Sequence, residues 1–176
     1  MAASPTIDLR EWIRDIPDFP KPGILFKDIT PLLGDPAAFR AAIDALAERF
    51  KDAGVDTIAA AEARGFIFGA PLALALDAGF VPIRKPGKLP YASVAVEYAL
   101  EYGTDRLEVH TDALTPGRRV LLLDDVLATG GTMAACCELV RQTGAELLGC
   151  AFVLELSVLN GRDKLKPYDV TSLITY

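Results

Sequence analysis

The residues best suited to chemistry lie in one stretch, where two adjacent carboxylates precede a loop of small residues. Asp124 and Asp125 follow an apolar run that begins at Val120. The loop Ala128–Thr132 then supplies two glycines and two threonines, and residues 133–140 are typical of a helix. This order predicts a buried strand, a turn at its carboxyl end and a helix that opens on the glycines. Open α/β sheets bind their ligands at such junctions.

The same loop suits a phosphate group. Free backbone N–H groups and the positive end of the helix dipole attract anions to a helix N-terminus. The two glycines let the backbone approach the anion closely, and the two threonines add hydroxyl donors. Asp124 and Asp125 would repel a phosphate, so we expect them to face sugar hydroxyls or a bound Mg²⁺ on the same ligand. A phosphorylated pentose carries all of these groups, whereas the alternative is an ordinary strand–turn–helix corner with surface acids.

Composition restricts the class of protein. A chain of 176 residues is expected to form one domain with a full core. Its net charge of −6 argues against a general nucleic-acid-binding surface. No apolar run approaches the roughly 20 residues that span a bilayer, and the N-terminus lacks a signal-peptide layout, so we expect a cytoplasmic protein without membrane contact. The three cysteines, which we interpret as buried apolar residues rather than metal ligands, are Cys136, Cys137 and Cys150.

Apolar patterns upstream of the loop predict a parallel α/β unit. Residues 55–61 and 80–84 are expected to be strands, joined by a helix within 66–78 whose regular part begins near Pro71. Two parallel strands with a helical crossover form a right-handed βαβ unit in nearly all proteins. Later strand patterns cover 147–156 and 169–176. We therefore expect an α/β fold with a mostly parallel, twisted sheet flanked by helices.

The N-terminal part is expected to dock on this body. Residues 7–16 place apolar side chains at helical spacing, which predicts a short amphipathic helix. The segment 24–31 is short and extended. It is either an edge strand or the wall of a flat pocket, with Phe26 as a stacking face. Asp35 followed by Pro36 is typical of a helix start.

A β-hairpin is predicted between the α/β units. Residues 93–102 alternate apolar and polar side chains, and the chain returns as a strand at 106–110. An inserted hairpin is a good candidate for a lid, or hood, that excludes water from a site. The stretch Arg84–Pro90, just before it, is the densest basic stretch in the chain and suits a polyanion, unless it is a solvated loop. His110 is interpreted as a surface residue.

The stretch from Val120 to Thr132 resembles the loop that binds phosphoribosyl pyrophosphate (PRPP) in the type I phosphoribosyltransferases. Further blocks resemble the members of this family that act on adenine, namely residues 16–31, 62–66, 83–90 and 100–103. The resemblance extends from about Ile13 to the C-terminus and is poorest at 91–98. It implies the type I phosphoribosyltransferase fold in a single domain over 1–176. A base-binding N-terminal segment would lie at about 16–31, and a hood hairpin at about 91–110.

The resemblance implies transfer of the phosphoribosyl group from PRPP to adenine, which gives AMP and pyrophosphate. Glu101 would handle the adenine N7 proton, and Tyr102 would help to close the lid. Asp124 and Asp125 would hold the ribose hydroxyls. The other implied contacts are to the 5′-phosphate (Ala128, Thr129, Gly130, Gly131, Thr132), to pyrophosphate (Ala63, Arg64, Arg84, Lys85, Lys88) and to adenine (Leu25, Phe26, Lys27, Leu156).

The resemblance also implies a cofactor and a partner. Mg²⁺ would be held mainly through PRPP, without direct protein ligands, and a homodimer would carry the basic loop across its interface. The family can have a cis peptide at the position that matches Ala63–Arg64. Two alternatives remain open: transfer to another purine base, and a PRPP-sensing regulator without catalysis. Glu101 and the basic loop favour an enzyme, as does the lack of a basic helix for a DNA-binding module.

Overall fold

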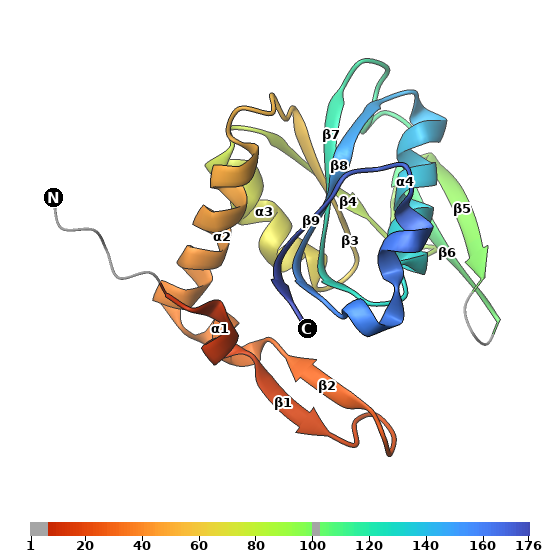
Figure 1. Cartoon of the computed structure of the whole chain (residues 1–176). Helices are drawn as coiled ribbons and strands as arrows, with labels where there is room; N and C mark the ends of the chain where they lie inside the picture. Colours follow the sequence, from red (N-terminus) through yellow and green to blue (C-terminus); the bar gives the residue numbers. More distant parts are fainter. Residues whose placement is uncertain (1–6, 100–102) are drawn as a thin grey trace, which may run out of the picture.

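A five-stranded parallel sheet forms the centre of the protein, which is described by a computed structural model over residues 7–99 and 103–176 (Figure 1). The strands, in their order across the sheet, are β4 (Gly79–Ile83), β3 (Thr57–Ala61), β7 (Arg119–Leu127), β8 (Glu146–Glu155) and β9 (Val170–Thr175). Each pairs in parallel with its neighbour, which confirms the predicted sheet. β7 is the middle strand, so its carboxyl end lies at the centre of one edge of the sheet.

Helices cover both faces of the sheet (Figure 1). The helices are α1 (Thr30–Gly34), α2 (Pro36–Phe50), α3 (Gly65–Ala75) and α4 (Gly131–Thr143). Leu121 and Leu123 of β7 pack with α1, α2 and α3, whereas Val120 and Leu122 pack with α4. This alternation follows from the two-residue period of a strand. Because both faces are covered, the strand is apolar from Val120 to Leu123, after which its two aspartates follow.

The predicted hairpin is confirmed, and it packs against helix α4. Strands β5 (Ser93–Ala99) and β6 (Thr104–His110) pair in antiparallel fashion, and Leu100, Glu101 and Tyr102 lie outside the described residues. Val96, Leu107 and Val109 share a hydrophobic core cluster with α4. Reciprocal backbone hydrogen bonds of 2.9 and 2.8 Å between Arg84 and Glu108 join the hairpin to the segment that follows β4.

The N-terminal segment differs from the prediction. The expected helix over 7–16 is wrong: a short 3-10 helix, η1 (Leu9–Trp12), is followed by strand β1 (Arg14–Pro17). β1 pairs in antiparallel fashion with β2 (Leu25–Asp28), and this pairing satisfies the backbone groups that a longer helix would have used. Figure 1 shows this ribbon below the body, near the C-terminus of the chain.

Two further expectations are corrected. Helix α3 begins at Gly65 and carries Pro71 inside it, although its regular part was expected to start near the proline. The buried side chains of Phe68 and Leu72 hold this turn against the sheet, so packing outweighs the local preference. His110 is not a plain surface residue, because its Nε2 atom is buried and lacks a hydrogen-bond partner among the described residues.

The remaining elements are short and the surface is mixed. Two 3-10 helices, η2 (Ser157–Leu159) and η3 (Gly161–Leu165), connect β8 to β9. All three cysteines are buried and unpaired, as expected.

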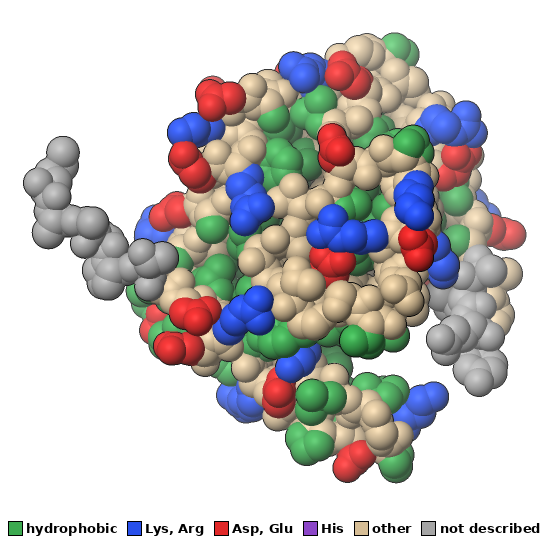
Figure 2. All heavy atoms as spheres, viewed as in Figure 1, with side chains coloured by type: hydrophobic (Ala, Val, Ile, Leu, Met, Phe, Trp, Pro, Cys, Tyr) green, Lys and Arg blue, Asp and Glu red, His purple; other side chains and the backbone are tan. Residues whose placement is uncertain are grey.

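Figure 2 shows acidic and basic side chains interspersed over the visible face, with hydrophobic side chains gathered on the lower ribbon. In the part of the chain that the structure describes, no helix has the length and apolar character needed to cross a membrane.

Candidate active site

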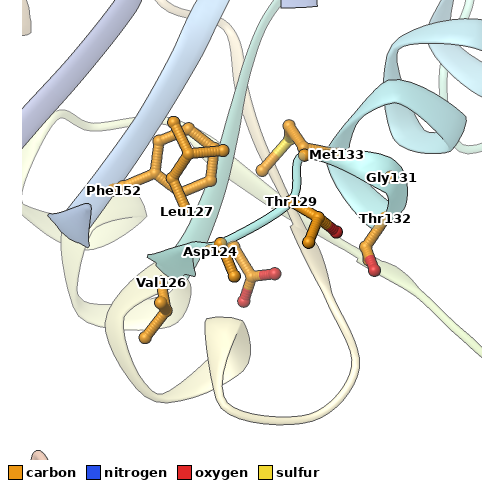
Figure 3. Close-up of a pocket in the computed structure, with 10 residues that line it drawn as sticks. Asp124, Val126, Leu127, Thr129, Gly131, Thr132, Met133 and Phe152 are labelled. Carbon is orange, nitrogen blue, oxygen red and sulfur yellow. The ribbon is translucent and has the colours of Figure 1, made fainter. Parts of the chain in front are cut away.

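The loop between β7 and α4 encloses a small hollow of about 80 Å³ (Figure 3). Its mouth carries the carboxylate of Asp124 and the hydroxyls of Thr129 and Thr132, and its apolar back wall is formed by Leu127, Met133 and Phe152. Gly130, at the N-terminal cap of α4, adopts a left-handed conformation with φ +77°. No side chain among the described residues caps the helix, and residues 130–133 line the hollow, so the N-terminal end of α4 suits an anion.

A second cavity of about 360 Å³ adjoins the first and mixes acids with cations. It shares Asp124 and Thr132 with the hollow and also contains Arg64 and Asp125. The Nε atom of Arg64 lies 2.9 Å from Oδ2 of Asp125, whose side chain is almost fully buried. The contact is an ion pair rather than an aligned hydrogen bond, because Oδ2 receives no hydrogen bond within the described residues. The buried oxygen therefore keeps its capacity to accept one from a ligand.

Burial raises the pKa of both carboxyl groups. Loss of hydration raises the pKa of Asp124 well above its usual value, and the neighbouring charge of Asp125 adds to the shift. Burial also raises the pKa of Asp125, although the Arg64 guanidinium opposes this shift. The backbone N–H of Asp125 donates to Oδ1 of Asp124 over 2.9 Å. The ionised pair is thus costly without a ligand, and hydroxyl donors or a cation would lower this cost.

The basic loop after β4 is held by acids of the same chain. Glu62 Oε2 accepts hydrogen bonds from Nε of Arg84 (2.9 Å) and from the backbone N–H of Lys85 (3.0 Å). These contacts lower the pKa of Glu62, and the hydrogen bond from Arg84 makes the largest contribution. The ammonium group of Lys85 donates to Asp105 Oδ2 over 2.6 Å, and this contact lowers the pKa of Asp105. Lys85 is thereby fixed at the rim of the second cavity.

Tyr98 of the hairpin contacts a residue that lines the small hollow. The hydroxyl of Tyr98 on β5 lies 3.2 Å from Asp105 Oδ2 and 3.4 Å from Thr132 Oγ1. Desolvation raises the pKa of Tyr98, which therefore stays protonated at neutral pH and can donate to one of these oxygens. A chain of polar contacts thus runs from Lys85 through the hairpin to the first turn of α4.

A third cavity, of about 540 Å³ and mainly apolar, lies between the N-terminal ribbon and the end of β8. Leu25, Lys27 and Leu156 line it, and Thr129 connects it to the small hollow. Phe26 points to the opposite side of β2, where its ring centre lies 5.8 Å from the guanidinium carbon of Arg64. The hollow therefore separates a charged cavity from an apolar one.

The chain matches known proteins over nearly its whole length. A family model described as the phosphoribosyl transferase domain matches residues 29–175. The chain belongs to the phosphoribosyltransferase family. An adenine phosphoribosyltransferase of Kosmotoga olearia is 60% identical over 170 residues, which are 97% of this chain and 100% of the relative. One of Maridesulfovibrio salexigens is 61% identical over 168 residues, covering 96% and 99% of the two chains.

Solved structures agree with the fold of this phosphoribosyltransferase. The crystal structure of adenine phosphoribosyltransferase from Thermoanaerobacter pseudethanolicus has a TM-score of 0.92 and 54% identity, covering 96% of this chain and 98% of that one. The Saccharomyces cerevisiae enzyme, complexed with an imino-altritol bisphosphate and adenine, has a TM-score of 0.89 and 45% identity, covering 94% and 96%. The expected family and its fold are therefore confirmed.

Most of the predicted site residues of the phosphoribosyltransferase lie around the three cavities, but not all of them do. The ones that line a cavity are Leu25, Lys27, Ala63, Arg64, Lys85, Asp124, Asp125, Ala128, Thr129, Gly130, Gly131, Thr132 and Leu156. Phe26 faces away from the apolar cavity, the Arg84 guanidinium is turned to Glu62, and Lys88 is exposed. Glu101 and Tyr102 lie outside the described residues.

Several residues of the charged cavity were not predicted from the sequence, and the cis peptide bond lies one position before the expected one. Glu62, Tyr98 and Asp105 were not singled out, yet all three line the charged cavity. Glu62 could have been noticed, since a carboxylate at the end of a buried strand lies where the basic loop must return. Tyr98 and Asp105 gave no local signal. The cis peptide joins Glu62 to Ala63, one bond before the expected position.

Asp124→Asn tests the cost of the buried acid pair. A folded-state pKa above the unfolded value means that ionisation destabilises the fold as the pH rises past the unfolded pKa. We expect the substitution to stabilise the free protein at pH 7 by about 1–2 kcal/mol, in the range typical of stabilising changes. The gain should shrink near pH 3, below the unfolded pKa, where this carboxyl group is largely protonated in both the folded and the unfolded state. Urea unfolding at the two pH values measures it.

The control for this measurement is Asp44→Asn, at an exposed position on α2. It should change the free energy of unfolding by less than about 0.5 kcal/mol at either pH. A loss of stability in Asp124→Asn at pH 7, or a gain that does not depend on pH, would contradict the argument.

Proposed function

We propose that this phosphoribosyltransferase transfers the 5-phosphoribosyl group of PRPP to adenine, which gives AMP and pyrophosphate. The observation that carries the proposal is the position of the small hollow between a charged and an apolar cavity. A phosphate in the hollow places the rest of PRPP beside the acids and cations, and a flat base beside the apolar walls. The names of the relatives, at 60% and 61% identity over nearly full length, support adenine as the base.

The donor side of the proposal follows from charge. Ala128, Thr129, Gly130, Gly131 and Thr132 would hold the 5′-phosphate on the open N–H groups of α4. Asp124 and Asp125 would accept hydrogen bonds from the ribose hydroxyls, which supplies the partner that Asp125 Oδ2 lacks. As the C1′–O bond breaks, negative charge grows on the leaving pyrophosphate. Ala63, Arg64 and Lys85, which line the charged cavity, would stabilise this charge in the transition state, together with Arg84 and Lys88 of the basic loop.

Mg²⁺ is proposed as the cofactor, carried mainly by the oxygens of PRPP. The described residues contain no cluster of three or more His, Cys, Asp or Glu side chains that could hold a metal alone. The acid pair nevertheless fits a cation, because the Arg64 guanidinium offsets only part of the cost of ionising two buried carboxyl groups. When bound, Mg²⁺ would neutralise charge on the pyrophosphate. Asp124 and Asp125 would orient the ribose beside it.

The acceptor side of the proposal uses the N-terminal segment, about residues 16–31. Leu25 and Lys27 would read the edge of adenine through their main-chain atoms, with Leu156 as one wall. The resemblance also implies stacking of Phe26 on the base; its ring, which now faces Arg64, would have to turn toward the apolar cavity to make this contact. Such a site would bind the ring mainly by apolar contact and orient it with few polar groups, as most small-molecule pockets do.

Glu101 is proposed as the catalytic residue, with Tyr102 as part of the lid. The proposal rests on the family resemblance and on the position of Glu101 in the sequence between β5 and β6. Its carboxylate would handle the N7 proton of adenine while N9 attacks C1′, so the base leaves the reaction neutral. General acid–base catalysis requires such a group within hydrogen-bond reach of the proton.

A homodimer is proposed, with Lys88 reaching the partner's site. Arg84 and Lys85 are held by Glu62 and Asp105 of the same chain, whereas Lys88 is exposed and shows no ion pair within residues 7–99 and 103–176. A cation without an ion pair among the described residues suits a site on a second subunit. We also propose the cytoplasm as the location, where the free cysteines would stay reduced.

The function is tested by a phosphoribosyl-transfer assay with PRPP and Mg²⁺ over adenine, hypoxanthine, guanine and xanthine. We expect AMP formation with adenine at least about 100-fold faster, as kcat/KM, than transfer to any oxopurine, because a site built to pair with a donor rejects the analogue that lacks it. EDTA should abolish the activity. Preference for an oxopurine would replace the acceptor, and PRPP binding without transfer to any base would favour a regulator.

Glu101→Gln separates catalysis from donor binding. The change should lower kcat by about 10²–10⁴-fold, the usual worth of general acid–base catalysis, and leave the Kd of PRPP within about twofold. Steady-state kinetics and calorimetric titration with PRPP measure the two quantities. Glu97→Gln, at an exposed position on β5 of the same hairpin, is the matched control and should keep its activity. Turnover near that of the wild type would remove Glu101 from the mechanism.

Mixed dimers test whether Lys88 acts across the interface. Lys88→Ala and Asp125→Asn should each lower activity alone. If Lys88 serves the partner's site, a mixed dimer contains one complete site, and random mixing should restore about a quarter of the wild-type activity. The mixture is made by co-expression and assayed at saturating adenine and PRPP. Activity no higher than the mean of the two variants would place Lys88 at the site of its own chain.

A further inference from the structure

The turn Asn160–Gly161–Arg162, after β8, lies directly behind the small hollow. A Cβ atom built on Gly161 would come within 2.3 Å of the Ala128 carbonyl oxygen and 2.8 Å of Leu127 Cδ1. In the opposite direction, a Cβ atom on Gly130 would come within 2.3 Å of the Gly161 carbonyl oxygen. The two backbones are therefore in mutual contact, and the gap between them has no room for a side chain on either segment.

Close approach is the reason that Gly161 must be glycine. Its φ angle lies outside the left-handed region, so the backbone conformation itself would accept other residues. Gly130 differs, because its φ of +77° favours glycine independently of any neighbour. Glycine is thus required at position 161 because the loop Ala128–Gly130 lies so close, and not because of the backbone conformation of its own turn.

An ion pair between the half-exposed Arg162 and the buried Glu155 fixes this turn to the sheet. The Arg162 guanidinium donates to both carboxylate oxygens of Glu155, with Nε and one terminal nitrogen each 2.7 Å from an oxygen. Its other terminal nitrogen donates to the Val170 carbonyl over 2.9 Å, and Ser172 adds a hydroxyl to Glu155. Only 5% of the Glu155 surface is exposed. Glu155 ends β8, and the loop Ala128–Gly130 follows β7, which pairs with β8. The turn and the loop are therefore held by two neighbouring strands of the sheet.

We propose that Gly161 is a positioning residue for PRPP binding, and that the Arg162–Glu155 pair holds it against the phosphate loop. The inference rests on the proposed binding of the 5′-phosphate in the small hollow. A side chain at 161 would push the Ala128 carbonyl outward and tilt the peptides whose N–H groups open α4. The proposed base site is another cavity, with Leu25 and Leu156 as walls. Donor affinity should therefore change while adenine affinity does not.

The test is Gly161→Ala, read by two measurements. Calorimetric titration with ribose 5-phosphate should show an affinity at least about tenfold weaker than in the wild type, because a displacement of about 1 Å in a site can cost two orders of magnitude. In the transfer assay, the KM for PRPP should rise by a similar factor. The KM for adenine, measured at saturating PRPP, should stay within about twofold.

The matched control is Gly34→Ala, at the end of α1, where a Cβ atom meets nothing within 4 Å and the φ angle lies outside the left-handed region. It makes the same chemical change and should leave both affinities as in the wild type. An unchanged ribose 5-phosphate affinity in Gly161→Ala would overturn the proposal, and so would an equal loss of affinity for adenine.

A second variant keeps the inference testable if Gly161→Ala does not fold. Arg162→Lys retains the charge but loses the two-pronged contact with Glu155, so the turn should loosen and weaken ribose 5-phosphate binding by several fold. Wild-type affinity in this variant, with Gly161→Ala unfolded, would refute the positioning role. Because ribose 5-phosphate binding needs no acceptor base, these outcomes stay distinct from failure of the adenine assay, which would refute the proposed reaction alone.

Discussion

The rest of the site depends on the cost of burying two neighbouring carboxylates at the carboxyl end of a strand. Asp124 and Asp125 lose hydration there, and the Arg64 guanidinium offsets only part of the cost. Gly65 has to be small beside them, since a Cβ atom on it would come within 3.0 Å of Asp124 Oδ1. The fold therefore holds this negative charge in a conformation that becomes favourable only when a ligand supplies hydroxyl donors or a cation.

Cations and acids alternate around the same cavity for a related reason. Arg84 is paired with Glu62 and Lys85 with Asp105, so the basic loop stays ordered beside the acid pair. A cavity lined by cations alone would suit a free polyanion, whereas this one suits a molecule that has both a diol and a pyrophosphate. The residues opposite the acids thus restrict the ligand class more closely than a phosphate-binding loop does alone.

Local patterns predicted the part of the fold that carries the phosphate loop. An apolar run, two acids and a loop of Gly and Thr are contiguous in sequence, so β7, the loop and α4 could be predicted without distant contacts. Residues 7–16 were misassigned because their apolar spacing fits both a helix and the observed strand that pairs with β2. Pro71 suggested a later helix start, but burial of the flanking side chains prevailed. Glu62, Asp105 and Gly161 gain their importance from neighbours 20 or more residues away, which no local pattern shows.

The contacts of Thr132 explain how separate segments can act together. Its hydroxyl lies in the first turn of α4 and 3.4 Å from Tyr98 on the hairpin, which in turn contacts Asp105, the partner of Lys85. A phosphate that draws the Thr132 hydroxyl toward itself would leave the Tyr98 hydroxyl to Asp105 alone. The hairpin thus contacts α4 through this short polar path in addition to the hydrophobic core that Val96, Leu107 and Val109 share with the helix.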